Sequence, residues 1–77
     1  MDISKKYDLA FMSAFNIDED KLGSDLIYES IDEWDSIGHM SLIAELEDAF
    51  EISMEMDDII DFSSYDKGKK ILEKYLE

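Results

Sequence analysis

The sequence predicts an all-α fold, a small four-helix bundle with a long loop between the first and second helices and a short third helix. Apolar residues recur every three or four positions in four segments, and no segment shows the strict alternation of a convincing strand. The 77 residues suffice for one domain, which we expect to span residues 1–77. With no cysteine and a single histidine, neither a disulfide framework nor a zinc site with the usual nitrogen and sulfur ligands is expected.

The first helix is expected over about residues 4–15, where Tyr7, Phe11 and Phe15 repeat at a helical spacing. This spacing is lost in residues 16–34, so the stretch is expected to be a long connection that crosses the bundle. Its apolar residues are expected to tuck under the helices: Leu22, Leu26, Ile27 and Ile31.

The other three helices follow in the second half of the chain. Periodicity predicts them over residues 36–50, about 56–60, and 64–76. Ser63 and Asp66 fit the Ser-x-x-Asp capping signature that opens a helix, so the last helix is expected to begin just after Ser63.

The helix expected over residues 36–50 carries two apolar faces. At about 100° per residue, one face collects the larger set: Leu42, Ile43, Leu46, Ala49 and Phe50. The nearly opposite face carries Ile37, Met40 and Ala44, next to Ser36. Since one face must pack on the bundle, the larger set is expected in the core and the smaller strip in solvent; the alternative is that another helix covers the strip. An exposed apolar strip flanked by carboxylates is typical of a docking surface.

The formal net charge of −14 is large for this chain length and is distributed unevenly. All seven basic residues are lysines, and none lies between Leu22 and Asp66. Such a surface repels nucleic acid and anionic lipid, so neither a nucleic-acid partner nor membrane insertion is expected. A solubilising coat is one interpretation, and docking onto basic partners is the one we prefer. The N-terminus lacks the apolar stretch of a signal peptide, which predicts a cytoplasmic protein.

Ser36 is expected to be an attachment point. It stands at the predicted start of the second helix, directly after Asp35. A phosphate attached to an exposed hydroxyl there would meet unpaired backbone N–H groups and the positive end of the helix dipole.

From this serine into the loop after the second helix, the chain resembles the acyl carrier proteins. The matching residues are Asp35, Ser36, Ile37, Leu42, Ile43, Leu46, Glu47, Asp48, Phe50, Ile52 and Met54. The likeness covers essentially the whole chain in length, helix order, acidity and serine position, and it implies a bundle of the acyl-carrier-protein type. It also implies that a phosphopantetheinyl transferase moves 4′-phosphopantetheine from coenzyme A to Ser36, with Asp35 as part of the modification motif. The arm's thiol would carry acyl groups as thioesters.

The same resemblance implies a carrier without catalysis of its own, expected to be a monomer. Its partners would be acyl-transferring, ligating or synthase enzymes with basic docking patches. The acidic residues that fall where the family contacts its partners are Glu45, Glu47, Asp48, Glu51, Asp57 and Asp58. Together with Ile37, Met40 and Ala44, they form the predicted docking surface.

Three departures from the common fatty-acid carriers favour a specialised pathway, such as one for a secondary metabolite or a surface glycan or lipid. Gly38 lowers the helix propensity near the helix start, Ser41 stands where fatty-acid carriers often have an acid, and residues 52–55 contain no proline. Fatty acid and polyketide cargo remain open. The alternatives are an aminoacyl or peptidyl carrier, and an acidic helical adaptor without a prosthetic group.

An EF-hand is the first of two other site types that the residues suggest. Asp18, Asp20, Gly23 and Glu29 match four positions of a calcium-binding loop. Leu22, however, occupies a position that needs an oxygen ligand, so no metal site is expected.

A hydrolytic triad is the second. Asp35, Ser36 and His39 supply its three residue types, but adjacency in sequence does not aim Asp35 at a histidine nitrogen, and no Gly-x-Ser-x-Gly elbow surrounds Ser36. We expect His39 to be a partly buried helix residue, the alternative being that it borders a cargo cavity. Trp34 is expected to pack the loop against the helix start. Gly68 would either permit close helix packing or leave room for cargo.

Overall fold

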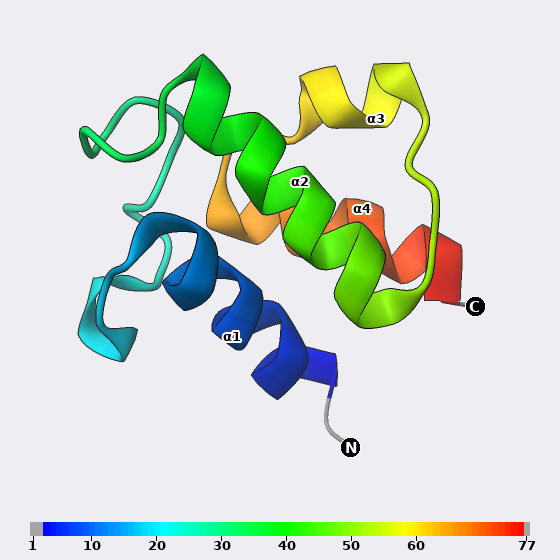
Figure 1. Cartoon of the computed structure of the whole chain (residues 1–77), viewed down its shortest axis with the longest axis horizontal. Coiled ribbons are helices and arrows are strands. Elements are labelled where there is room, and N and C mark those ends of the chain that lie inside the picture. The colour runs from blue at the N-terminus through cyan, green and yellow to red at the C-terminus, as the bar shows by residue number, and fades with distance from the viewer. Residues whose placement is uncertain (1–2, 77) are drawn as a thin grey trace.

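Four α-helices and one short 3₁₀ helix make up residues 3–76, the part of the chain that this computed structural model describes (Figure 1). They are α1 (Ile3–Phe15), η1 (Glu19–Lys21), α2 (Ser36–Phe50), α3 (Met56–Asp61) and α4 (Tyr65–Leu76). Within this range there is no β-strand, only an isolated antiparallel bridge between Ile27 and Ser64. The predicted all-α class is confirmed, as are the long connection after α1 and the short third helix.

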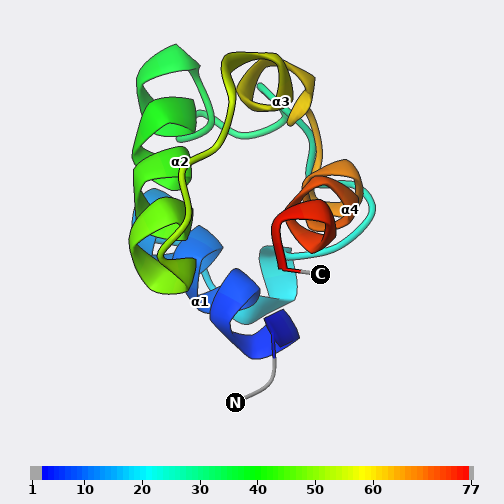
Figure 2. The ribbon, with the colours of Figure 1, turned by 90° about the vertical axis from the view of Figure 1, so that its right-hand side faces the viewer.

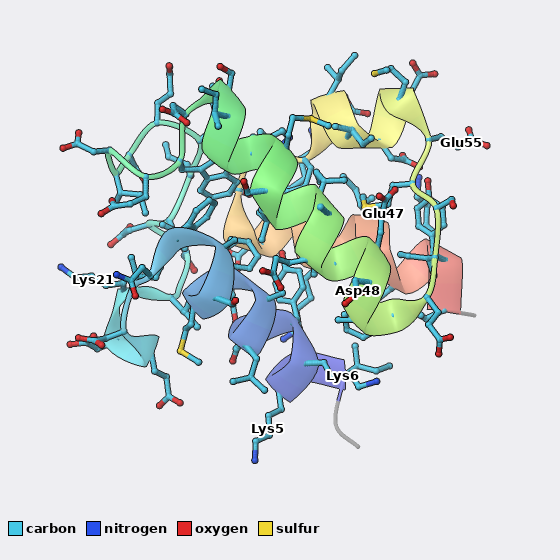
Figure 3. All side chains as sticks on the ribbon, in the orientation of Figure 1. Lys5, Lys6, Lys21, Glu47, Asp48 and Glu55 are labelled. Carbon is cyan, nitrogen blue, oxygen red and sulfur yellow. The ribbon has the colours of Figure 1, made fainter. Side chains whose placement is uncertain are left out.

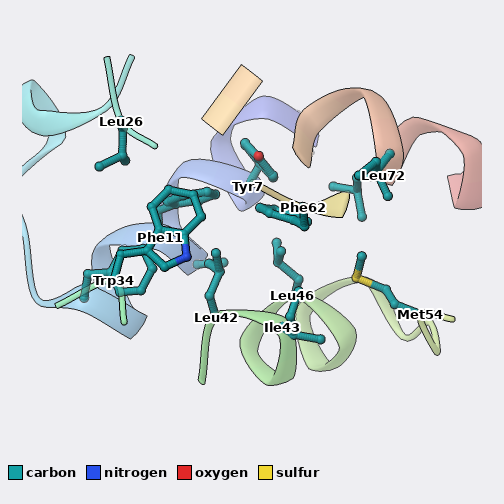
Figure 4. Packing of buried hydrophobic residues seen from close by; sticks show 13 residues of the cluster. Tyr7, Phe11, Leu26, Trp34, Leu42, Ile43, Leu46, Met54, Phe62 and Leu72 are labelled. Carbon is teal, nitrogen blue, oxygen red and sulfur yellow. The ribbon is translucent and has the colours of Figure 1, made fainter. Parts of the chain in front are cut away.

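The helices surround one apolar core. Figure 2 shows α2 on the left, α3 and α4 on the right and α1 below them. Buried apolar side chains from α1, α2, α4 and the connections between the helices form one cluster. Aromatic rings dominate this core, since Tyr7, Phe11 and Phe15 of α1 are buried with Trp34 and Phe62 (Figure 4). Close ring pairs add to the stabilisation that burial of apolar area provides.

The expected tucking of the long connection is only partly confirmed. Leu26 is buried, whereas Leu22 and Ile31 are half-buried. Ile27 is 49% exposed, so its expected burial was wrong. The reason is local: the backbone is extended where Ile27 bridges Ser64, and neighbouring side chains of an extended segment point to opposite sides.

The cap of α4 lies one residue later than the sequence signature indicated. The Ser64 hydroxyl, not that of Ser63, accepts a hydrogen bond from the backbone N–H of Lys67 over 3.0 Å. The Ser63 carbonyl instead accepts from the backbone N–H of Tyr28 over 2.9 Å. This contact with the long connection keeps Ser63 outside the helix, which begins at Tyr65.

Tyrosines attach the start of α4 to α1. The Tyr7 hydroxyl donates to the Tyr65 carbonyl over 2.6 Å, and the Tyr65 hydroxyl donates to the Asp8 carboxylate. Burial raises the pKa of Tyr7 far above its usual value, so the phenol remains a donor at physiological pH. Gly68 lies beside these rings, and a Cβ there would collide with the Phe62 ring. Gly68 therefore permits close packing.

Among residues 3–76, no helix combines the length and apolar character needed to cross a membrane.

Candidate functional site

Ser36 is the first residue of α2 and is exposed. Asp35 precedes it as the N-cap, in extended conformation, and its side chain accepts a hydrogen bond from the Gly38 N–H over 2.7 Å. The cap satisfies one of the free backbone donors at the helix start and leaves the N–H groups of Ser36 and Ile37 without intrahelical partners. The helix N-terminus thus presents a hydroxyl in a positive backbone environment.

Gly38 has a steric role that its helix propensity does not reveal. A Cβ at this position would collide with the backbone carbonyl oxygen of Glu33. The end of the long connection therefore runs directly against the first turn of α2.

An apolar pocket of about 390 Å³ opens beside Ser36. Figures 1 and 2 place α3 and the start of α2 at the same end of the bundle, and the pocket lies between them and the long connection. Its lining residues are Tyr28, Ser36, His39, Met40, Met56, Ile59, Ile60, Phe62 and Ser63. Met56 and Ile60 are strongly exposed at its rim, whereas Phe62 is buried. The pocket therefore has an open mouth and a closed inner end.

His39 forms part of the inner wall of the pocket and is hydrogen-bonded on both sides. Its Nδ1 accepts from the Trp34 indole N–H over 2.9 Å, and its Nε2 lies 2.8 Å from the Ile59 carbonyl oxygen. An indole nitrogen can only donate and a carbonyl can only accept, so the ring is neutral with its proton on Nε2. The expectation of a partly buried helix residue is confirmed, and His39 also borders the cavity, as the alternative held.

These contacts rule out a triad in this conformation. The Asp35 side chain accepts a hydrogen bond from the Gly38 N–H, and both His39 nitrogens have other partners.

Among the described residues, no three histidine, aspartate or glutamate side chains gather closely enough to hold a metal ion. The 3₁₀ helix Glu19–Lys21 forms in the segment where the EF-hand pattern lay.

Trp34 packs the connection against α2, as expected. Its ring is fully buried, and ring contacts join it to Phe11 and Phe15 of α1. The ring also stacks on His39, with centroids 6.2 Å apart and planes 15° apart. One side chain thus links α1, α2 and the connection.

The two faces of α2 are arranged as the sequence predicted. On the core face Leu42, Ile43 and Leu46 are buried, and the remaining two members are half-buried: Ala49 and Phe50. The strip on the other face is exposed: Ile37, Met40 and Ala44. Ile37 has the largest exposed fraction among the large apolar residues that stand out at the surface, 78%. Within the described chain, no other helix covers the strip.

Two of the predicted docking acids on α2 have partners within the chain. Glu45 accepts from the Ser13 hydroxyl over 3.2 Å, and Glu47 accepts from the Met54 backbone N–H over 2.8 Å. Glu47 thereby holds the loop that follows α2. The other acids in this part of the docking surface, Asp48 and Glu51, are exposed.

Asp58 links α3 to α4 by a salt bridge and a hydrogen bond. Lys74 Nζ lies 2.8 Å from one carboxylate oxygen of Asp58, and the Tyr75 hydroxyl donates to the other. Hydrogen bonds from Lys74 and Tyr75 lower the pKa of Asp58, and the same contact raises the pKa of Lys74. Asp57, one residue earlier, is exposed.

Three of the lysines lie away from the start of α2: Lys5, Lys6 and Lys21. Lys6 Nζ contacts the Ala49 carbonyl at the far end of α2, over 3.4 Å. Figure 3 shows Lys5 and Lys6 at this end of the bundle and Lys21 beside the connection.

No model of a known protein family matches the chain, and a search of curated proteins gives no significant match. The function is therefore inferred from the residues and their geometry.

Proposed function

We propose that this chain is an acyl carrier protein, with 4′-phosphopantetheine attached to Ser36. The observation that carries the proposal is an exposed serine at a helix N-terminus that also lines an apolar pocket. The resemblance of the sequence to this family supports it. The arm, when bound, would supply a thiol that carries acyl groups as thioesters.

The residues at the start of α2 fit such a group. The Ser36 hydroxyl is exposed to a partner enzyme, and a helix N-terminus favours a phosphate. In the transfer reaction the Ser36 oxygen would bond to the pantetheine phosphate of coenzyme A. The pyrophosphate bond of coenzyme A would break, adenosine 3′,5′-bisphosphate would leave, and a base of the transferase would take the hydroxyl proton. Asp35 contributes by holding the first turn in place.

The pocket beside Ser36 gives the cargo a place away from water. Its lining is mainly apolar, with Met40, Ile59 and Phe62 among the contributors. Such surfaces bind apolar groups by removing their area from water, and they also exclude water from a reactive bond.

A carrier needs no catalytic residues, which suits the site. The tether raises the effective concentration of its cargo at each partner's active site, and the partners supply the chemistry. The exposed strip of Ile37, Met40 and Ala44 would provide apolar contacts to those partners. Asp48 and Glu51 would attract a basic rim around them.

The proposed pathway is a specialised one. Gly38 and Ser41 depart from the usual fatty-acid carrier pattern, and so does the absence of proline in residues 52–55. We place the carrier in the cytoplasm as a monomer, in line with the sequence.

The decisive experiment is intact-protein mass after incubation with coenzyme A, magnesium and broad-specificity phosphopantetheinyl transferases. The mass should rise by one arm, and Ser36→Ala should abolish the increase. Ser41→Ala is the matched control, because Ser41 is an exposed serine on the same helix. A wild type that stays unmodified with several transferases would refute the carrier.

The exposed strip also favours a second candidate, an acidic helical adaptor that binds basic partners without a prosthetic group. The same mass experiment separates the two, since an adaptor would bind its partners equally well with Ser36→Ala. An aminoacyl or peptidyl carrier would be modified like an acyl carrier and would differ in the group that partner ligases attach.

A further inference from the structure

We infer that Phe62 and His39 form a fixed floor that restricts the pocket to short apolar cargo. This inference rests on the proposed function and deepens it, because it names the class of group that the carrier shelters. It follows from the way in which the two side chains are held, from what lies behind them, and from the size of the space in front.

Phe62 cannot turn aside easily. Its side chain is 1% exposed, and its ring centroid lies 6.1 Å from that of Phe11 and 6.4 Å from that of Tyr7 (Figure 4). On the α4 side the ring reaches so close to Gly68 that a Cβ there would collide with it. Because the ring is packed from α1 and α4, it closes the inner end of the pocket.

His39 closes the adjacent part of the floor. Two hydrogen bonds hold the imidazole, one from Trp34 and one to Ile59, and its centroid lies 6.0 Å from that of Phe62. A swing of the ring towards solvent would break both bonds. The loss of the Trp34 bond would also leave a buried indole N–H without a partner, which is costly.

The space behind this floor is already filled. Trp34, Phe11 and Tyr7 are completely buried there, and their rings contact one another or Phe62. Protein cores are close-packed, so a chain could go deeper only by displacing one of these rings. The cargo must therefore end at the floor.

The volume in front of the floor sets the scale. The pocket of about 390 Å³ equals roughly a dozen groups of the size of a water molecule, each taking about 30 Å³. Part of this space lies at the open mouth and would be taken by the attachment itself. A chain of about eight carbons fills the rest. Longer chains would leave through the mouth and lie over the exposed side chains of Met56 and Ile60, where they stay in contact with water.

A direct test needs no transferase. The chain has no cysteine, so Ser36→Cys introduces a single thiol at the mouth of the pocket. Alkyl methanethiosulfonates from ethyl to hexadecyl then attach the chains: the thiolate sulfur bonds to the alkyl-bearing sulfur, and methanesulfinate leaves. A chain that binds the folded state raises the melting temperature. We expect the melting temperature to rise from ethyl to about octyl and to level off beyond it.

Two variants should change the depth of the pocket in opposite directions. In the Ser36→Cys background, Phe62→Val should lower the overall stability. The melting temperature should then keep rising for chains about two methylene groups longer, because the substitution releases about that much volume. Phe15→Val is the matched control, because Phe15 is equally buried but does not line the pocket, and it should leave the plateau in place. Ile59→Phe should fill the pocket and bring the plateau to shorter chains. If Phe62→Val does not fold, the chain lengths at which the melting temperature levels off without it and in Ile59→Phe still test the floor.

The outcomes are separable from those of the carrier experiment. A melting temperature that keeps rising through hexadecyl, or one that ignores chain length, would overturn the floor even if Ser36 accepts the arm. A plateau near octyl in a chain that no transferase modifies would support the floor and count against the carrier.

Discussion

The indole N–H of Trp34 donates to Nδ1 of His39 over 2.9 Å, which joins the end of the long connection to the second turn of α2. Trp34 is fully buried, so its N–H has no access to water. The bond also fixes the tautomer in which Nε2 of His39 can donate to the Ile59 carbonyl of α3.

His39→Leu should therefore destabilise the chain although it adds an apolar group to an apolar pocket. The buried indole N–H loses its partner, at a cost of about 1–3 kcal/mol in the free energy of unfolding. Urea denaturation measures the change. A double-mutant cycle with Trp34→Phe isolates the bond, and strictly additive effects of the two substitutions would contradict it.

Gly38→Ala should lower stability despite its favourable helix propensity. Alanine gains about 1 kcal/mol over glycine inside a helix, but the new Cβ collides with the Glu33 carbonyl, and overpacking of this kind costs about 1–3 kcal/mol. Ser41→Ala, at an exposed position of the same helix, is the control and should be neutral or slightly stabilising. If both alanines stabilise in urea denaturation, the connection does not press on Gly38.

The salt bridge between Asp58 and Lys74 should make the free energy of unfolding depend on pH in a defined way. Because the folded state lowers the pKa of Asp58, its contribution is present above the unfolded value of about 3.9 and is lost as pH falls through the lower folded value. The raised pKa of Lys74 gives a contribution that is present below about 10.4 and is lost as pH rises through the higher folded value. Asp58→Asn should lower the melting temperature at pH near 7, and the difference from wild type should shrink in acid. A constant difference down to pH 2 would exclude this origin.

The apolar strip should matter for docking and not for folding. Ile37→Asn should leave the melting temperature nearly unchanged, because the side chain is 78% exposed, while slowing modification of Ser36 by the transferase. Leu9→Asn on α1 is the control, an exposed apolar residue outside the docking surface, and should leave the rate unchanged. Leu46→Ala on the core face should instead cost about 2–5 kcal/mol in unfolding free energy. Equal rates for the two asparagine variants would exclude docking through the strip.

Salt should act in opposite directions on folding and on docking. The net charge of −14 repels itself in the folded chain, so the melting temperature should rise as the Debye length falls from about 30 Å at 0.01 M to about 3 Å at 1 M salt. The same screening should reduce the association rate with a basic partner, while dissociation changes less. Melting and transferase kinetics on one salt series test both. A rate that is insensitive to salt would mean that the acids only solubilise the chain.

Some of these features could be predicted from the sequence because they repeat along it. The two faces of α2 follow from helical periodicity. The position of the α4 cap could not be predicted, since both Ser63 and Ser64 can cap a helix. A hydrogen bond from Tyr28, far away in the sequence, decides between them.

Features that depend on contacts across the bundle could not be predicted from local patterns either. Ile27 is exposed and His39 has two partners because of contacts across the bundle, and the spacing of residues carries no trace of such contacts. One signal was present but ambiguous: Gly38 could mark either a weak helix start or a close approach of backbone, and only the Glu33 carbonyl shows which applies.

The shortest α-helix, α3, is also the least buried, which affects how often the pocket opens. No side chain of α3 is fully buried. Its links to the rest of the bundle include the Ile59 carbonyl on His39, the Asp58 carboxylate on Lys74 and Tyr75, and the partly buried Ile59 side chain against the core. Segments with few buried contacts open locally while the rest of a protein stays folded. The amides of α3 should therefore exchange with deuterium long before those of α1, whose rings form the core. Since α3 is one wall of the pocket, this opening sets how often anything sheltered there meets the solvent.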